Sequence, residues 1–178
     1  KGINTVIVGQ PNVGKSSLLN AMLRENKAIV TSIPGTTRDV IEGRLNLENI
    51  TLNLIDTAGI RETDDEVEKI GVDRSKEWLE KAELVLFLID GSKDIEEEDK
   101  LLYEQIKNQE HLVIVNKQDL ELKANVDFVK KPIYISTKDT NEIEMLEKEI
   151  VKKVLADNIN IDDLTYVSNA RQINKLKD

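Results

Sequence analysis

The chain contains no cysteine, so neither a disulfide nor a thiolate-bound zinc ion can form within it. A fold of this size needs no such cross-link, because a chain of 178 residues can bury roughly two thirds of its unfolded surface. We therefore expect one globular domain whose core is held by apolar packing.

Basic and aromatic side chains are also scarce. The chain has 25 lysines and arginines against 34 aspartates and glutamates, a net charge of −9, and only 3% of its residues are aromatic. Nucleic acids are bound by basic surfaces that release counterions, and single strands by aromatic residues on which bases stack. This composition excludes the domain as the main binding surface for RNA, so an RNA partner would need other protein segments.

Long apolar runs are absent as well. The longest covers 84–89, whereas a helix needs about twenty apolar residues to cross a bilayer. We find no signal peptide and expect a cytoplasmic protein that does not insert into a membrane.

The apolar pattern alternates between that of strands and that of helices. Strands are predicted at 4–9, 40–47, 50–57, 84–90, 112–116 and 132–136, and helices at 15–23, 67–82, 95–108 and 143–155. The second and third strands flank Glu48-Asn49 and predict a hairpin that adds one antiparallel edge strand. The rest predicts an α/β fold: a mostly parallel six-stranded sheet with helices on both faces. The acidic run 96–99 is expected to be a helix start that faces solvent.

A phosphate-binding motif connects the first strand to the first helix. Residues 9–16 read Gly-Gln-Pro-Asn-Val-Gly-Lys-Ser and match G-x-x-x-x-G-K-[ST] in the strand and helix context that this pattern requires. The glycines let backbone N–H groups surround phosphate oxygens, Lys15 reaches the outer phosphates, and the Ser16 hydroxyl can bind Mg2+.

A second motif, Asn116-Lys117-Gln118-Asp119, directly follows the strand predicted at 112–116. Ligands of α/β sheets bind at the carboxyl ends of the strands, so its position favours ligand contact. The Asp119 carboxylate can accept hydrogen bonds from N1–H and the 2-amino group of guanine, whereas adenine presents an acceptor at N1 and no 2-amino group. The motif therefore predicts a preference for guanine over adenine.

The complete set of motifs resembles that of the translation-factor class of GTPases. It consists of Gly9 to Ser16, Gly35-Thr36-Thr37-Arg38-Asp39, Asp56-Thr57-Ala58-Gly59 and Asn116 to Asp119. Ser136-Thr137-Lys138 is similar to the Ser-Ala-Lys that backs the base in GTPases, with Thr137 in place of alanine. Within the TrmE-Era-EngA-like group, Asp56 to Thr63 together with Val67 to Val72 looks like the G domain of the MnmE (TrmE) family of tRNA-modification GTPases.

This resemblance implies a Ras-like P-loop GTPase fold and a set of binding residues. The nucleotide would be bound by Asn12, Val13, Gly14, Lys15, Ser16, Ser17, Asp56, Gly59, Asn116, Lys117, Asp119, Ser136, Thr137 and Lys138. Two ions are implied as cofactors. Ser16 and Thr37 would bind Mg2+, and Asn12, Thr31, Ile33 and Thr36 would form an oxygen cage for K+.

The sequence pattern alone does not decide which side chain orients the attacking water. Ile60 stands where Ras-like enzymes carry a glutamine, and an aliphatic side chain cannot polarise water. The polar candidates downstream are Arg61, Glu62, Asp64, Asp65, Glu66 and Glu68. The family resemblance assigns the catalytic role to Glu68.

The resemblance also implies a function and partners. It implies a potassium-stimulated GTPase module of a tRNA wobble-uridine modification enzyme that binds GTP and GDP, pairs with a second G domain and works with the flavin-dependent partner MnmG. The alternative is a ribosome-assembly switch of the Era or EngA kind. A P-loop small-molecule kinase is disfavoured, because Asn116 to Asp119 and Asp56 to Gly59 would then have no role.

The chain begins at Lys1 without an initiator methionine and ends in a polar stretch of helical character. We expect both ends to be cuts through a longer protein. On this interpretation 1–160 is the GTP-binding domain and 161–178 starts a following helical segment, and tRNA would be bound through domains outside the chain.

Overall fold

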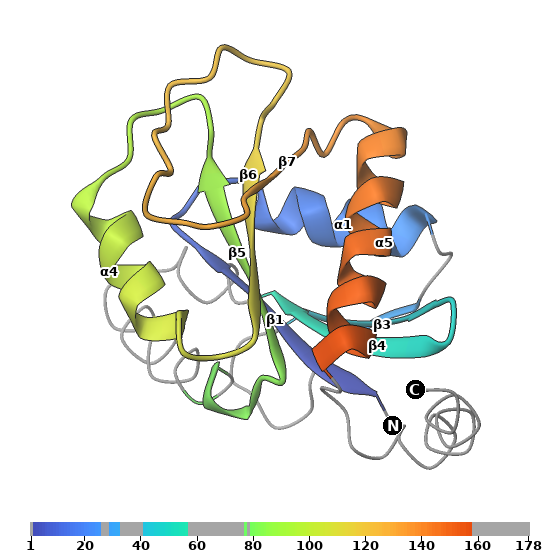
Figure 1. Cartoon of the computed structure of the whole chain (residues 1–178). Coiled ribbons are helices and arrows are strands. Elements are labelled where there is room, and N and C mark those ends of the chain that lie inside the picture. The colour runs from blue at the N-terminus through green and yellow to red at the C-terminus, as the bar shows by residue number, and fades with distance from the viewer. Residues whose placement is uncertain (1, 26–28, 33–40, 57–76, 78, 158–178) are drawn as a thin grey trace, which may run out of the picture.

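The computed structural model of the chain describes residues 2–25, 29–32, 41–56, 77 and 79–157 (Figure 1). The described strands are β1 (Ile3–Gly9), β2 (Ile29–Ser32), β3 (Ile41–Leu47), β4 (Ile50–Asp56), β5 (Leu84–Asp90), β6 (His111–Asn116) and β7 (Ile133–Tyr134). The described helices with assigned bounds are α1 (Lys15–Glu25), α4 (Glu97–Ile106) and α5 (Thr140–Asp157). Most of the helix expected at 67–82 lies outside the described residues.

The strands form one sheet in the order β2-β3-β4-β1-β5-β6-β7. Only β3 runs against its neighbours, pairing antiparallel with both β2 and β4. The mostly parallel α/β fold is therefore confirmed, but two details differ. Over the residues that the structure describes, the sheet has seven strands rather than six, and the antiparallel strand is not at the edge, because the four-residue strand β2 covers it. A segment as short as Ile29–Ser32 shows too little alternation to be recognised.

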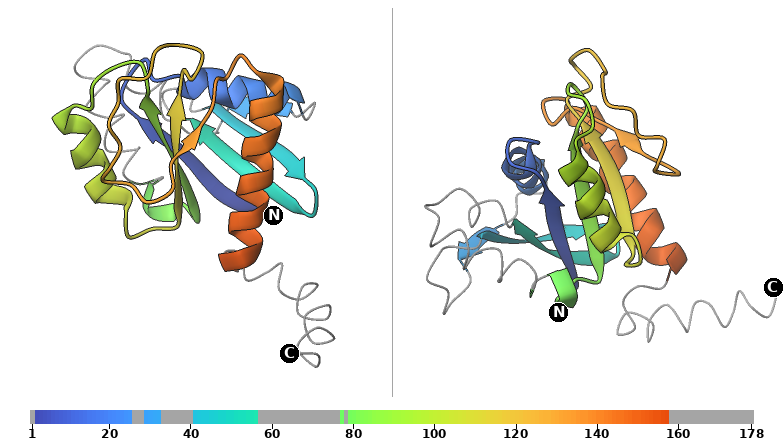
Figure 2. Two further views of the ribbon diagram at one scale, coloured as in Figure 1. Left: turned by 45° about the horizontal axis from the view of Figure 1, so that its top comes forward. Right: turned by 90° about the vertical axis from the view of Figure 1, so that its left-hand side faces the viewer.

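Strand alternation divides the core into two layers. On β1, Ile3 and Ile7 belong to the layer that also contains the apolar side chains of α1 and α5, whereas Val6 and Val8 belong to the layer of α4. Helix α4 accordingly lies on the other side of the sheet from α1 and α5 (Figures 1 and 2). The sheet is covered on both faces, which explains why β5 is buried along its whole length.

The acidic start of α4 is not wholly exposed to solvent, contrary to our expectation. Asp99 is buried, and its carboxylate accepts a hydrogen bond of 2.9 Å from the backbone N–H of Glu96. This contact is half of a capping box, in which the side chain of Glu96 binds the backbone of Asp99 in return. Asp99 is therefore a capping residue that the helix turns inward.

One edge of the sheet collects the ends of its parallel strands. Gly9 at the end of β1 pairs in register with Leu88 on β5, and Asp90 at the end of β5 pairs with Asn116 at the end of β6. The loops after these three strands consequently start side by side. The phosphate-binding motif at 9–16 lies in the loop after β1, and the motif at 116–119 lies in the loop after β6.

Candidate nucleotide-binding site

The loop after β1 turns sharply before α1 begins. Asn12 has φ of 68° and Gly14 has φ of 107°, both in the region that favours residues without a bulky side chain. The first backbone hydrogen bond of α1 then runs from Leu18 N–H to the Gly14 carbonyl at 2.9 Å. Ser16 and Ser17 are exposed in the first turn of this helix. The loop and the helix N-terminus together have the geometry of an anion-binding site.

Lys15 places a positive charge inside this loop. Its Nζ lies 2.7 Å from the carbonyl oxygens of both Gly9 and Gln10, and the residue is only 3% exposed. An ammonium held by loop carbonyls has few accessible conformations, so its contact with a phosphate would cost little side-chain entropy. Lys15 thus lies inside the loop where the motif places it, and its contact with phosphate stays a prediction.

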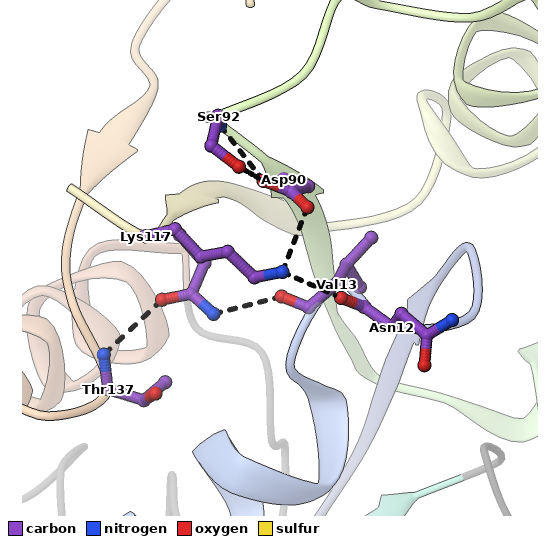
Figure 3. Close-up of polar contacts among 7 residues, drawn as sticks. Asn12, Val13, Asp90, Ser92, Lys117 and Thr137 are labelled. Atoms are coloured by element: carbon purple, nitrogen blue, oxygen red, sulfur yellow. Dashed lines mark hydrogen bonds and ion pairs between the residues drawn. The ribbon is translucent and has the colours of Figure 1, made fainter. Parts of the chain in front are cut away.

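Asn116 joins three loops at the carboxyl edge. Its Nδ2 donates to the Val13 carbonyl at 2.9 Å, and its Oδ1 accepts from the Thr137 N–H at 3.3 Å (Figure 3). The residue is 2% exposed, and a Cβ added to Gly14 would collide with its Nδ2. Thr137 contributes through its backbone, so the threonine that stands in place of alanine does not alter this contact.

Lys117 forms the second connection between the same loops. Its Nζ donates to the Asn12 carbonyl at 3.0 Å and lies 2.9 Å from Oδ2 of Asp90 (Figure 3). Like Asn12, Lys117 has a left-handed backbone, with φ of 68°. The extended stem of the lysine therefore spans from the end of β6 to the phosphate-binding loop and the end of β5.

Asp90 is a site residue that the sequence motifs did not identify. Burial by itself would raise the pKa of its carboxyl, but hydrogen bonds from the Ser92 hydroxyl, Lys117 and the Ser92 N–H, with the charge of Lys117, outweigh that effect and hold the pKa below its usual value. Asp90 thus stays ionised and anchors Lys117. The available signal was its position at the carboxyl end of a buried strand beside the motif strand.

The expected base-reading residues lie on two neighbouring loops. Asp119 is partly exposed, and its Oδ2 lies 3.8 Å from Nζ of Lys138. Ser136 is buried, and its Oγ accepts a hydrogen bond of 3.2 Å from the Lys138 N–H. An open cavity of about 410 Å³ lies along the two loops, lined by Gln118, Asp119, Ser136, Lys138, Asp139, Thr140, Asn141 and Glu142.

Several expected site residues cannot be placed in this geometry. Ile33, Thr36, Thr37, Gly59 and Glu68 lie outside the described residues, and Thr31 and Asp56 are described by their backbones alone. Asp56 ends β4 and pairs with Ile7 of β1, which puts its backbone at the same sheet edge as the phosphate-binding loop. Among the residues that the structure does describe, no group of three or more His, Cys, Asp or Glu side chains could hold a metal ion.

A family model described as 50S ribosome-binding GTPase matches residues 4–117, well over half of the chain. The chain belongs to this GTPase family. The match includes the phosphate-binding loop and ends at Lys117. Asp119 and residues 136–138 lie beyond the match, and in the structure Asn116 connects Thr137 to Val13 of the phosphate-binding loop.

Curated relatives carry the same kind of domain within longer proteins. The tRNA modification GTPase MnmE of Oceanobacillus iheyensis is 47% identical to this GTPase domain, and the protein of the same description from Staphylococcus haemolyticus is 48% identical. Each alignment covers 99% of this chain and 40% of the relative. The chain therefore spans less than half the length of these proteins.

Solved structures agree with the fold of this GTPase. A variant of Era from Aquifex aeolicus, crystallised with GDP and aluminium fluoride, superposes with a TM-score of 0.65 at 28% identity over 86% of this chain and 57% of its own. The G domain of the FeoB iron transporter of T. maritima gives 0.62 at 25% identity over 85% of this chain and 98% of its own. The Ras-like GTPase fold predicted from the sequence is confirmed.

Within the described part of this GTPase, no helix has both the length and the apolar character needed to span a membrane.

The polar side chains of Asn116 and Lys117 lie at the carboxyl edge of the sheet, where they join the phosphate-binding loop to the loops after β6 and β7. An arrangement that couples phosphate contact to base contact can bind a whole nucleotide as one unit.

Proposed function

We propose that the chain is the GTP-hydrolysing domain of an enzyme that modifies the wobble uridine of tRNA in the cytoplasm. Its 47–48% identity to tRNA modification GTPases over nearly the whole chain carries this proposal. Those relatives are longer than this chain. We therefore assign contact with RNA, and contact with a flavin-dependent partner of the MnmG kind, to segments outside the chain. The net charge of −9 supports this division, because an acidic domain repels tRNA.

Guanine recognition is assigned to the loop after β6. The Asp119 carboxylate accepts from N1–H and the 2-amino group, while Lys117 and Asn116 keep this loop against the phosphate-binding loop through Asn12 and Val13. Bound adenine would leave the carboxylate facing a lone pair, and an unpaired buried polar group costs about 1–3 kcal/mol. Ser16 is exposed beside Lys15 and fits the role of a Mg2+ ligand with Thr37. Bound Mg2+ would neutralise charge on the outer phosphates.

Competition between GTP and ATP for the purified protein tests nucleotide binding. We expect clear preference for GTP, and preference for ATP would contradict the assignment. Asp119→Asn should weaken GDP binding about 10- to 100-fold and favour xanthosine diphosphate, whose 2-oxo group accepts from an amide. Asp127→Asn, an equal change of charge at an exposed residue outside both loops, is the matched control and should bind GDP normally.

Hydrolysis is assigned to Glu68, which would orient the attacking water, with K+ as the cation near the developing phosphate charge. Asn12 supports the ion site. Its carbonyl is bound by Lys117, while its exposed side chain points away from that network (Figure 3), so the amide oxygen can serve an ion. Thr31, Ile33 and Thr36 would supply the remaining oxygens.

The potassium dependence is tested by measuring GTP turnover in K+ and in Na+ at equal ionic strength. We expect a much faster rate in K+, and Asn12→Ala should remove most of the difference, because the variant loses an oxygen ligand. Glu68→Ala should lower turnover in both salts while GDP affinity is retained. Equal rates of the unaltered protein in the two salts would contradict the ion site.

A ribosome-assembly switch is the second candidate, supported by the Era neighbours, one of them solved with a piece of 16S ribosomal RNA. Mass spectrometry of tRNA nucleosides from cells that lack the gene separates the two. Loss of modified wobble uridine with normal ribosome profiles supports tRNA modification. Unchanged nucleosides with accumulated ribosome precursors would support the switch instead.

A further inference from the structure

We propose that Glu142 is a positioning residue for guanine recognition, which ties both base-contacting loops to the start of helix α5. This inference rests on the proposed guanine site and adds a specificity-determining residue that none of the sequence motifs contains. Glu142 lies two positions after Thr140, the first residue of α5, on the cavity shared by the two loops.

Glu142 does not perform the helix-capping role that its position favours. Asp139 caps α5, accepting from the N–H groups of Asn141 at 2.9 Å and Glu142 at 3.3 Å. In a capping box, Glu142 would accept from the Asp139 N–H in return. That N–H instead donates to the Ser136 carbonyl at 3.0 Å, and the Glu142 carboxylate reaches one turn further back.

Each oxygen of the Glu142 carboxylate holds a different loop. Oε1 accepts a hydrogen bond of 2.6 Å from the N–H of Ser136, and Oε2 accepts from the side-chain amide of Gln118. Gln118 lies between Lys117 and Asp119, and Ser136 precedes Thr137. One carboxyl side chain therefore bridges the loop that reads the base and the loop that backs it.

The bridge matters because the Asp119 side chain is held more weakly than its backbone, whose neighbours Gln118 and Leu120 donate N–H hydrogen bonds of 2.9 Å to the Ile135 and Lys117 carbonyls. Gln118 and Asp119 are exposed, and the ion pair of Asp119 with Lys138 is long, at 3.8 Å, and open to solvent. A carboxylate that accepts two hydrogen bonds from one base edge must be held in a narrow range of orientation. Glu142 supplies this restraint from helix α5, through Gln118 and Ser136.

The test compares GDP with inosine diphosphate, which lacks the 2-amino group. In Glu142→Ala we expect the dissociation constant for GDP to rise about tenfold and that for inosine diphosphate to rise less, because a misaligned Asp119 loses the 2-amino contact. Glu142→Gln retains one acceptor oxygen, so its dissociation constant for GDP should lie between those of the unaltered protein and of Glu142→Ala. Turnover at saturating GTP should not change. Glu144→Ala, an exposed glutamate of the same helix, is the control and should match the unaltered protein.

Equal losses for both nucleotides, or no loss, would overturn the positioning role. If Glu142→Ala does not fold, the ratio of the two dissociation constants in Glu142→Gln decides by the same criterion. If the unaltered protein binds ADP as tightly as GDP, the proposed guanine site is overturned and this inference with it. A normal guanine preference with an unchanged ratio in the variants would overturn this inference alone.

Discussion

Individual side chains at the carboxyl edge of the sheet form hydrogen bonds and an ion pair with groups of neighbouring loops. Asn116 uses its amide nitrogen on Val13 and its amide oxygen on Thr137, and Lys117 bridges Asp90 and the Asn12 carbonyl. Buried polar groups are costly unless they are paired, so such contacts make the arrangement self-consistent. The protein's own side chains therefore hold these loops together.

Asp90 gives this network a measurable pH dependence. Its folded pKa lies below the unfolded value, so its contribution to stability is complete above about pH 4 and is lost as the pH falls through the folded pKa. We expect Asp90→Asn to lower the free energy of unfolding by about 1–2 kcal/mol at pH 7, since a charge-assisted bond to Lys117 is weakened. The deficit should shrink towards pH 3.

Urea unfolding of both proteins at pH 7 and pH 3 measures this difference. Asp94→Asn, which removes the same charge at an exposed position nearby, serves as the control and should change stability little at either pH. A deficit for Asp90→Asn that is equally large at pH 3 would show that the ionised carboxylate is not its source.

At the scale of elements, the turn of the β3–β4 hairpin contains a residue whose backbone conformation is unfavourable for its type. Leu47 pairs with Ile50, so the turn consists of Glu48 and Asn49 alone, as the sequence predicted. Among the described non-glycine residues, positive φ is confined to Asn12, Glu48 and Lys117, and Glu48 has φ of 49°. A left-handed glutamate is strained by roughly 1–2 kcal/mol.

Replacing this residue by glycine should stabilise the hairpin. Glycine removes the strain but increases the entropy of the unfolded chain, by about 0.4–1 kcal/mol. We therefore expect Glu48→Gly to raise the free energy of unfolding by about 0.5 kcal/mol, measured by urea unfolding. Asn49→Gly has no such strain to relieve and should be destabilising. The hairpin argument fails if both variants are destabilised alike.

At the scale of the whole molecule, the fold separates stability from ligand contact. Two apolar layers cover the faces of one sheet, and the polar loops gather at one edge of it. The nucleotide face is therefore formed by loops that the core positions but does not cover.

We propose, from the resemblance to the MnmE family, that two G domains pair across this nucleotide face. With GDP, aluminium fluoride and K+, we expect light scattering to report a dimer, because the family resemblance implies G-domain pairing in the transition state. With GDP and Na+ the protein should stay monomeric. Persistent monomers under the first condition would contradict the pairing, whereas dimers under both would show that the association does not depend on the nucleotide state.

The sequence by itself determined the fold class, the GTPase motifs and most element positions, because these depend on short-range features. A glycine-rich loop is needed wherever backbone surrounds phosphate, and β5 occupies the predicted range 84–90 since a strand buried on both faces is continuously apolar. The hairpin was evident for the same reason: its turn and its alternation are local.

Tertiary structure alone decided which residues meet. Asp90 and Glu142 are ordinary acidic residues in the sequence, and only the packing of strands and helices brings them to Lys117 and to the base-contacting loops. The edge strand β2 likewise exists because β3 has a second side to pair. Hydrogen-bond partners far apart in the chain are chosen by the fold, and no local pattern records them.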